Sequence, residues 1–516
     1  MSKQFGKRPC PAKGETITSS ECGSSRNRLF VCPADCPFNP FALANYERLM
    51  EIESKLDREC LDWLHSIAAK PQALLQQLSR LYASGDPLAL HSFFAVRLFH
   101  ERDDAGLSAG ERFLESRDHG LSNDQQALLR SRCGMRVTLL EVHRVIDHER
   151  IEAVDLLAPE AGCFLIIDRS LARMAVRYTT VLAWRYELPH FQRFCGVAIT
   201  VPEIVDLDPD AVVREISRHL GGPESGPELL GWLALNFVRV QASINAIHAV
   251  LHYDMLSSVD ARRGVAVYNL RRPLALCFEH LIQLIEWAPG ELTDGEFKEG
   301  FLDALDCLEA PAEGKIANSI LGRLLVGDDR WRLEANGGER FARLRCTFES
   351  HMGDLVEFAG ERFDDLAAGI ARPVSQEQLA LVPPGLRLQP TQIELTTTRI
   401  VDTENSPAQI AAAAHEEFLR IYPDVAVPAL GGLTPRQAAT DPRHRPTLLR
   451  LLKGQVRSFD EENLRQGTSG DMDWLLRELD ASELILPPPP LRLPSELNGP
   501  TSAVDDVLDG RGGQYS

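Results

Sequence analysis

Four cysteines near the start of the chain carry the clearest chemical signal in the sequence. Cys10, Cys22, Cys32 and Cys36 all fall within the first 36 residues, whereas the other seven cysteines are scattered over the remaining 480. Four thiolates can bind Zn²⁺ in a tetrahedral site, and the spacing of Cys32 and Cys36 suits a pair of ligands. Because sulfur would fill every position, no position would stay open for a reacting water. The sequence therefore predicts a structural zinc site rather than a catalytic one.

Two other interpretations of these cysteines stay open. Cys10 and Cys22 are further apart than a standard pair of zinc ligands, which is compatible with four unrelated cysteines in a disordered tail. Clustered thiols can also serve redox chemistry. His65, His91 and His100 occur on predicted helices downstream, where a packed or solvated histidine is the simpler interpretation than a further metal ligand.

The residues around these cysteines explain why a metal would be needed. Pro, Gly and Ser interrupt residues 1–44 so often that no long periodic element can form, and such a piece needs an external staple. Metal binding supplies folding energy to a segment with little core of its own. We therefore assign residues 1–44 to a cysteine-rich, zinc-binding segment.

Charge and hydropathy limit the class of protein. The formal net charge is −19, which argues against nonspecific binding to nucleic acid or to an anionic membrane. The first 36 residues run the other way, with six basic and three acidic side chains, and could contact phosphate. The chain starts without the apolar core of a secretory signal, and no apolar run reaches the roughly 18 residues of a membrane span. We expect a cytoplasmic protein with mostly reduced thiols.

The elements behind the cysteines predict an α+β fold, with a mostly helical body and a small five-stranded β-barrel-like insert. Residues 45–134 show helical periodicity and begin with Asn45 as an N-cap. Residues 135–202 are rich in β-branched and aromatic residues, and five short strands in so few residues favour a small antiparallel barrel. The predicted strands are Met135–Ile146, Arg150–Leu157, Cys163–Ile167, Tyr178–Tyr186 and Phe191–Val201.

The predicted barrel raises a second possibility, because small barrels can bind nucleic acid through exposed aromatic rings on a basic face. The candidates are Tyr178, Trp184, Tyr186 and Phe191, with Arg173, Arg177, Arg185 and Arg193 nearby. We favour the plainer interpretation, in which the aromatic residues form the barrel core and the arginines its outer face.

The rest of the chain predicts further domains. Residues 203–371 form a helical or α+β domain, with one long helix over Glu228–Leu256 and a strand–strand–helix unit over residues 316–358. Residues 372–407 are a proline-rich linker, residues 408–485 a C-terminal helical domain that starts with an alanine-rich helix, and residues 486–516 a disordered tail. Thr434 is an N-cap with Pro435 in the first turn of its helix.

No sequence motif identifies an enzyme. The chain lacks a Walker A loop, a dinucleotide-binding glycine fingerprint, a His-Glu-x-x-His zinc motif and a Gly-x-Ser-x-Gly elbow. His190 and Cys195 are close in sequence, but a nucleophilic pair also needs a base within hydrogen-bond reach and an oxyanion hole. An enzyme with a noncanonical site in a cleft between the helical body and the barrel is the third hypothesis.

Residues 427–439, Val-Pro-Ala-Leu-Gly-Gly-Leu-Thr-Pro-Arg-Gln-Ala-Ala, followed by Leu448-Leu-Arg-Leu-Leu452, resemble a C-terminal segment of bacterial proteins that carry the SEC-C zinc-binding motif. They are also similar to a segment of the toxin-binding domain of Xre-type antitoxins. The looser resemblance to the SEC-C-associated proteins covers roughly residues 130–480 and implies an architecture rather than an activity. The SEC-C motif itself, Cys-Pro-Cys-Gly-Ser-Gly followed by Cys-Cys or Cys-His, is missing, so zinc binding is carried to Cys10, Cys22, Cys32 and Cys36 by analogy only.

The sequence thus predicts a bacterial, cytoplasmic zinc-binding protein that acts as an interaction or adaptor module with a protein partner. The alternative is a nucleic-acid-binding protein that uses the basic cysteine-rich segment and the barrel. Such a protein would lose affinity steeply as salt rises. No membrane partner is expected.

Overall fold

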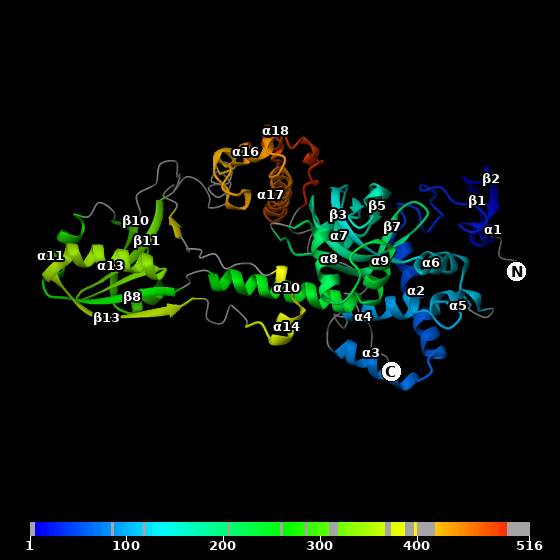
Figure 1. Cartoon of the computed structure of the whole chain (residues 1–516), viewed down its shortest axis with the longest axis horizontal. Helices are drawn as coiled ribbons and strands as arrows, with labels where there is room; N and C mark the ends of the chain where they lie inside the picture. Colours follow the sequence, from blue (N-terminus) through cyan, green and yellow to red (C-terminus); the bar gives the residue numbers. More distant parts are fainter. Residues whose placement is uncertain are drawn as a thin grey trace. The chain divides into compact units, whose positions relative to one another are not determined.

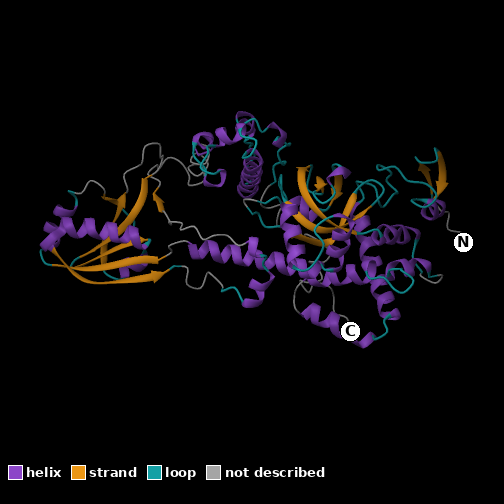
Figure 2. Cartoon of the chain, in the orientation of Figure 1, coloured by secondary structure: helices purple, strands orange, loops and turns teal. Residues whose placement is uncertain are grey.

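The computed structural model describes residues 6–83, 87–116, 120–204, 207–258, 262–283, 287–308, 318–366, 373–386, 397–399 and 418–492. The chain divides into two compact units. The first comprises Met1–Asn245, Leu381–Leu386 and Pro423–Ser516, and the second comprises Ala246–Ala380 and Arg387–Tyr422. Figure 1 labels the elements of both, and Figure 2 distinguishes their helices from their strands.

The first unit begins with the cysteine-rich segment, which contains a short antiparallel hairpin and a helix of about two turns. Strands β1 (Lys7–Cys10) and β2 (Glu15–Thr18) pair with each other, and Thr18 caps helix α1 (Ser19–Ser25) by accepting from the backbone N–H of Glu21. The helices that follow are α2 (Tyr46–Ile67), α3 (Pro71–Ala83), α4 (Pro87–Ala95), the π-helical turn η1 (Val96–His100), α5 (Ala109–Glu115) and α6 (Asn123–Cys133).

The predicted five-stranded barrel is confirmed. Its strands close in the order β3-β4-β5-β7-β6, and every pair is antiparallel except β5 with β7. Each strand begins within two residues of its predicted start, and helix α7 (Arg169–Met174) connects β5 to β6. The strands are β3 (Arg136–Val145), β4 (Arg150–Asp155), β5 (Phe164–Ile167), β6 (Thr180–Glu187) and β7 (Gln192–Thr200).

The barrel aromatic residues are buried, but they lie outside the apolar cluster at the barrel core, and the arginines do not form an outer face. Tyr178, Trp184, Tyr186 and Phe191 are at most 5% exposed, so their rings cannot stack on a nucleic acid base. Three of the arginines are buried as well, and each forms an ion pair with a carboxylate. The pair compensates the cost of removing the guanidinium charge from water. These pairs are Arg177 with Asp460, Arg185 with Asp155, and Arg193 with Glu53.

Helices complete the first unit. The single helix predicted over Glu228–Leu256 is two, because Asn236 ends the first by directing both its backbone N–H and its side-chain amide to the carbonyl of Trp232. The capping prediction for Thr434 is confirmed by a full capping box with Gln437. The helices are α8 (Pro209–His219), α9 (Gly226–Leu235), α16 (Pro435–Thr440), α17 (Arg445–Gln466) and α18 (Asp473–Glu478), together with the part of α10 (Phe237–Ser258) that precedes Ala246.

The second unit is an antiparallel sheet with helix α13 (Gly338–Met352) packed on one face. The strand order is β13-β8-β12-β11-β10-β9, and β14 (Thr397–Arg399) pairs with the start of β11. The helix lies close to the sheet because two strand positions are glycine: a Cβ at Gly264 would stand 2.2 Å from Phe341, and one at Gly322 would stand 2.2 Å from Leu344.

The strand–strand–helix unit predicted over residues 316–358 is present as β11, β12 and α13, but the sequence interpretation missed most other strands of this sheet. The strands are β8 (Arg262–Leu270), β9 (Trp287–Pro289), β10 (Phe301–Leu308), β11 (Asn318–Gly327), β12 (Arg330–Asn336) and β13 (Val356–Asp365). The other helices are α11 (Leu274–Leu281), α12 (Asp294–Lys298) and α14 (Gln376–Leu381).

Some predictions fall on residues outside the described ranges. These are most of the alanine-rich helix over residues 408–422, parts of the linker over residues 372–407, and residues 493–516 of the tail. In the portion of the chain that is described, none of the helices combines the length and apolar character that crossing a bilayer would require.

Candidate metal centre

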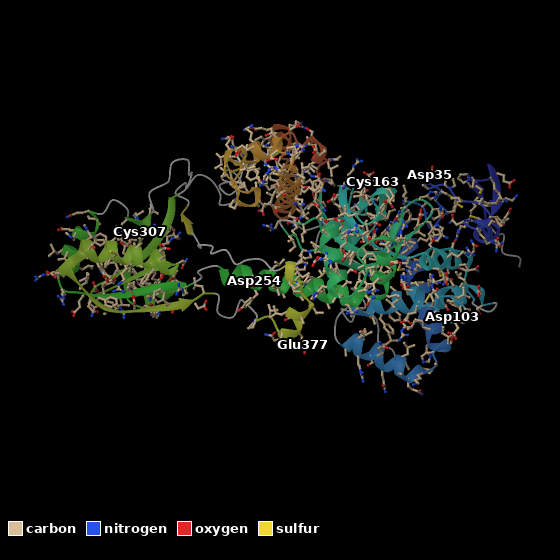
Figure 3. All side chains as sticks on the ribbon, viewed as in Figure 1. Asp35, Asp103, Cys163, Asp254, Cys307 and Glu377 are labelled. Atoms are coloured by element: carbon tan, nitrogen blue, oxygen red, sulfur yellow. The ribbon has the colours of Figure 1, made fainter. Side chains whose placement is uncertain are left out.

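The four N-terminal cysteines come from three different pieces of backbone. Cys10 ends strand β1, Cys22 lies in helix α1, and Cys32 and Cys36 belong to the loop that leads to α2. All four are buried, with exposed fractions between 4% and 8%. In contrast, Cys163 at the start of the barrel strand β5 is exposed (Figure 3). Burial of every thiol of the group in so short a segment places them all in its interior.

The thiols share one small interior. Cys10, Ile17 and Cys22 form a buried cluster, and Phe30 and Phe38 pack against it. Burial raises the pKa of the Cys32 thiol to about 11, and the nearby thiols of Cys36, Cys22 and Cys10 contribute to the increase. Cys32 is therefore within electrostatic range of the other three.

The thiols are neighbours without being arranged as ligands. Among the residues that the structure describes, no three His, Cys, Asp or Glu side chains stand in positions that could hold a metal ion. All eleven cysteines are free thiols. Metal binding requires the thiols to lose their protons, and a preformed site is rarely present before the metal binds. Neutral thiols therefore need not stand in the positions of ligands. The four thiols are thus near one another, but their sulfur atoms do not form a tetrahedral site.

Short-range backbone hydrogen bonds fix the positions of the four cysteines. The carbonyl of Cys10 accepts from the N–H groups of Lys13 at 3.2 Å and Gly14 at 2.9 Å, which closes the turn between the two strands. The N–H of Cys36 donates to the carbonyl of Pro33 at 3.2 Å. Asn27, in the left-handed region with φ of 53°, accepts from the N–H of Cys32 through its side chain at 3.4 Å. Turns rather than long elements therefore position the sulfurs.

Arg26 and Arg48 each interact with Cys22, and Arg8 interacts with Arg48. Burial opposes the charge of Arg26, but its bonds to Asp124 and its contact with Cys22 hold its pKa above the ordinary value. Burial lowers the pKa of Arg48, and the neighbouring charges of Arg26 and Arg8 lower it further. These arginines have no motif that the sequence could reveal, and the sequence analysis did not single them out.

The cysteine-rich segment is fastened to the helical body by one buried ion pair. The Arg26 Nε donates to the Asp124 Oδ1 at 2.7 Å, and its second nitrogen bonds the other carboxylate oxygen. The Asn123 side chain donates to the carbonyl of Arg26 at 2.7 Å. Asp124 and Asn123 both belong to the first turn of α6, nearly a hundred residues further along the chain. No local sequence signal could have revealed this connection.

A second connection reaches the barrel. His190, in the loop between β6 and β7, donates its Nε2–H to the carbonyl of Cys32. The sequence had placed His190 near Cys195, where a nucleophilic pair was conceivable. The side chain of His190 instead serves the cysteine-rich segment, and burial raises the pKa of Cys195 to about 11, as expected for an unreactive thiol.

Comparison with known proteins gives no relative from which to transfer a role, since no protein-family model, curated protein or solved structure matches the chain.

Proposed function

We propose that Cys10, Cys22, Cys32 and Cys36 bind one Zn²⁺ ion as thiolates, and that the zinc-folded segment is the recognition end of an adaptor protein. The observation that carries the proposal is the burial of all four thiols within one short segment, with Cys10 and Cys22 in the same cluster. Ile17 is the single buried apolar residue, other than cysteine, in the cluster at its centre. So small a core cannot stabilise a segment of this length, whereas a structural zinc ion can.

The charges around the site suit this proposal. The ion would contribute four strong bonds to sulfur and no open position for chemistry. A zinc ion with four thiolates carries two net negative charges. Arg8, Arg26 and Arg48 would help to balance them, with Asp124 as a carboxylate close to Arg26 and Arg48. Outer groups of this kind orient the ligands and tune a metal site.

The adaptor part of the proposal rests on the loop between the second and third cysteines. Leu29 and Val31 are 69% and 66% exposed, while Phe30 between them packs inward on the cysteine cluster. Backbone bonds from Arg28 and Leu29 to the carbonyl of Ser25 hold this loop in shape. Exposed apolar side chains on a rigid loop suit contact with a protein. The resemblance to SEC-C-associated proteins belongs to this same proposal.

Metal analysis of the purified protein tests the site. We expect about one zinc per chain under non-chelating conditions, and loss of most of it in the double variant Cys32→Ser/Cys36→Ser. The matched control is Cys163→Ser/Cys346→Ser, which removes two exposed thiols and should retain zinc. Less than about half an equivalent of zinc in the unaltered protein contradicts the proposal.

Photo-cross-linking tests the adaptor role. A photoreactive residue at position 29 should give a protein adduct in cells, and the adduct should vanish in the Cys32→Ser/Cys36→Ser background. Position 174 is the control, because Met174 is 72% exposed but lies on helix α7 of the barrel. Equal adducts from both positions would show that exposure alone produces them.

A further inference from the structure

The chain has a second feature that the metal site does not explain, a proline-rich segment bound along the barrel. We use the term strap for residues 484–492, Leu-Ile-Leu-Pro-Pro-Pro-Pro-Leu-Arg. The sequence interpretation placed residues 486–492 in a disordered tail, yet the structure gives them defined hydrogen bonds. From Ile485 onward the strap has no regular secondary structure, so its backbone groups must find partners elsewhere.

The first anchor of the strap is at its beginning. The Tyr178 hydroxyl donates to the carbonyl of Leu484 at 2.6 Å, and an Arg177 nitrogen donates to the carbonyl of Leu486 at 2.8 Å. The other Arg177 nitrogens hold Asp460 of α17 at 2.7 and 2.8 Å, with both side chains fully buried. Tyr178 has a φ of 62°, a backbone conformation that residues other than glycine rarely adopt. The surrounding structure must therefore hold the backbone in place at this residue.

The second anchor is at the end of the strap. One nitrogen of Arg492 donates to three carbonyls at the C-terminal end of helix α7, those of Ala172 and Ala175 at 2.8 Å and of Arg173 at 3.0 Å. Carbonyls at this end of a helix have no partner within the helix and attract a cation. Arg492 is 7% exposed, and burial lowers its pKa while Asp460 opposes that decrease.

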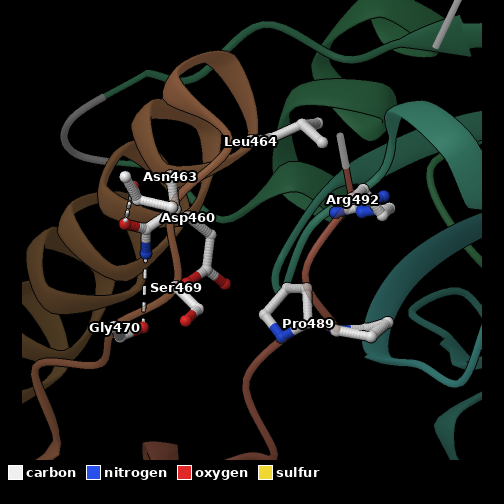
Figure 4. A pocket seen from close by; sticks show the side chains of 9 residues that line it. Asp460, Asn463, Leu464, Ser469, Gly470, Pro489 and Arg492 are labelled. Atoms are coloured by element: carbon white, nitrogen blue, oxygen red, sulfur yellow. Dashed lines mark hydrogen bonds between the residues drawn. The ribbon is translucent and has the colours of Figure 1, made fainter. Parts of the chain in front are cut away.

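Between the anchors the strap contributes little burial. Pro487, Pro488 and Pro490 are exposed, and Leu491 is 55% exposed. A small pocket remains beside the strap, with Pro489 and Arg492 on one side and Asp460, Asn463 and Ser469 on the other (Figure 4). Consecutive prolines favour an extended helix before binding and so lose little conformational entropy on binding. The strap is a stiff spacer with a recognised group at each end.

We infer that Arg177, Tyr178 and the C-terminal end of α7 form a binding site for an extended, proline-rich peptide that carries an arginine after its prolines, and that the strap occupies this site within the same chain. The site recognises backbone carbonyls and one guanidinium, so a peptide of the same chemistry satisfies it equally. The natural competitor is a segment of a partner protein. A second copy of the chain is disfavoured, because its strap is already bound at the high effective concentration of a tethered ligand. The strap therefore keeps the site closed until a partner displaces it.

Peptide binding to the full-length chain tests this inference. The probe is a fluorescein-labelled peptide with the sequence of residues 482–492, and the variant Arg492→Ala weakens the tethered strap at one anchor. We expect the variant to bind the probe about tenfold more tightly than the unaltered chain, since it loses charge-assisted hydrogen bonds of the strap. Arg465→Ala, which removes an exposed arginine of α17, should bind the probe no better than the unaltered chain. A peptide with alanine in place of its arginine should bind more weakly.

Three results would overturn the inference: no binding of the probe to folded Arg492→Ala, equal binding to this variant and to the unaltered chain, or equal binding of the peptide that lacks arginine. A concentration-dependent dimer with exchanged straps would show that the ligand is a second copy rather than a partner. If the variant does not fold, a probe with a photoreactive group in place of Leu491 is cross-linked to the unaltered chain at high concentration. Adducts must then map to residues 169–178, and adducts elsewhere would refute the site.

Discussion

The barrel and the cysteine-rich segment both bury side chains that can ionise, but they stabilise them in different ways. In the barrel, charged groups are paired with one another beneath a closed sheet. In the cysteine-rich segment, four thiols are buried, and the apolar cluster around Cys10 and Cys22 has only Ile17 as a further buried member. The first region is held by its own ion pairs and apolar core, whereas the second is the region for which we propose a metal ion.

The pair formed by Glu53 and Arg193 shows how the barrel manages this. Glu53 of α2 accepts two bonds of 3.0 Å from Arg193 and a third from the Tyr186 hydroxyl. Burial would raise the pKa of Glu53, but the Arg193 guanidinium holds it below its ordinary value. Arg193 also donates to Asp168 at 3.1 Å. Eleven buried apolar residues in the barrel cluster supply the stability that such a network needs.

The cysteine-rich segment has no apolar core of comparable size. Its strands are four residues each, and its apolar cluster holds three buried residues, two of which are cysteines. The Arg26–Asp124 pair attaches the segment to α6 but does not shape its interior. Under the zinc proposal, the segment depends on its sulfurs for its fold, while the barrel does not.

Removal of the metal should separate the two regions most clearly. With a chelator, or in Cys32→Ser/Cys36→Ser, we expect residues 6–44 to unfold while the barrel stays folded, because zinc contributes on the order of 10 kcal/mol to small zinc-dependent folds. Limited proteolysis followed by mass spectrometry would detect rapid cleavage near Leu29 and slow cleavage in residues 136–200. The control Cys163→Ser/Cys346→Ser should keep the unaltered pattern. Identical cleavage rates with and without chelator would end the comparison, because the segment would then be stable without metal.

Breaking the buried pair of Glu53 and Arg193 should destabilise the barrel region and leave the cysteine-rich segment unchanged. Arg193→Met leaves Glu53 buried without its partner and should destabilise the first unit by about 3–5 kcal/mol, while bound zinc stays unchanged. Denaturant unfolding followed by near-UV circular dichroism measures the loss. The double variant Glu53→Leu/Arg193→Met removes both charges and should recover most of the stability. A cost below about 1 kcal/mol for the single variant would show that Glu53 becomes protonated easily and that the pair matters little.

The sequence was sufficient where local chemistry decides the structure. The barrel strands could be predicted because β-branched residues in Met135–Ile146 and its successors alternate between clear turns. Thr434 was predictable because a capping box is local. The roles of Asp124, His190 and Glu53 could not be predicted, since each of these residues binds a residue that is distant in the chain.

The missed strands of the second unit have a physical explanation as well. Strand β13 (Val356–Asp365) carries five charged residues and leaves most of its positions accessible, as an edge strand commonly does, so its apolar pattern is weak. Strand β8 (Arg262–Leu270) begins with two arginines and a glycine, and that glycine is needed for contact with Phe341 rather than for the strand. In both cases tertiary packing outweighs local propensity.

Acid should weaken the body through a histidine that the zinc site does not use. The His100 ring lies 4.5 Å from that of Trp184, and burial, with a smaller effect of Arg102, lowers the pKa of His100 to about 4. The native state therefore keeps His100 neutral while the unfolded chain takes up a proton below about pH 6.5. Stability from this group is complete above that pH and is lost as the pH falls toward 4, by at most about 3 kcal/mol.

This dependence is best measured in the Cys32→Ser/Cys36→Ser background, so that protonation of zinc ligands does not contribute. His100→Gln should flatten the change in unfolding free energy between pH 6.5 and 4. His148→Gln, at an exposed histidine, should leave it as it is. Equal pH dependence in all three proteins would mean that His100 is already solvated in the native state.

The smallest effect concerns the point at which the two regions meet. Ser122 caps α6 through a capping box with Gln125, and the first turn of that helix carries both Asn123 and Asp124, which hold Arg26. Ser122→Ala should cost about 1 kcal/mol by fraying that turn. Because the turn serves the cysteine-rich segment rather than the barrel, amide hydrogen exchange should rise in residues 19–28 and stay constant in β3 and β6. Ser116→Ala, at the C-terminal end of α5, should change the exchange neither in residues 19–28 nor in the barrel strands. An equal rise in the barrel strands would show that the two regions share their stability, and the contrast between them would then describe composition only.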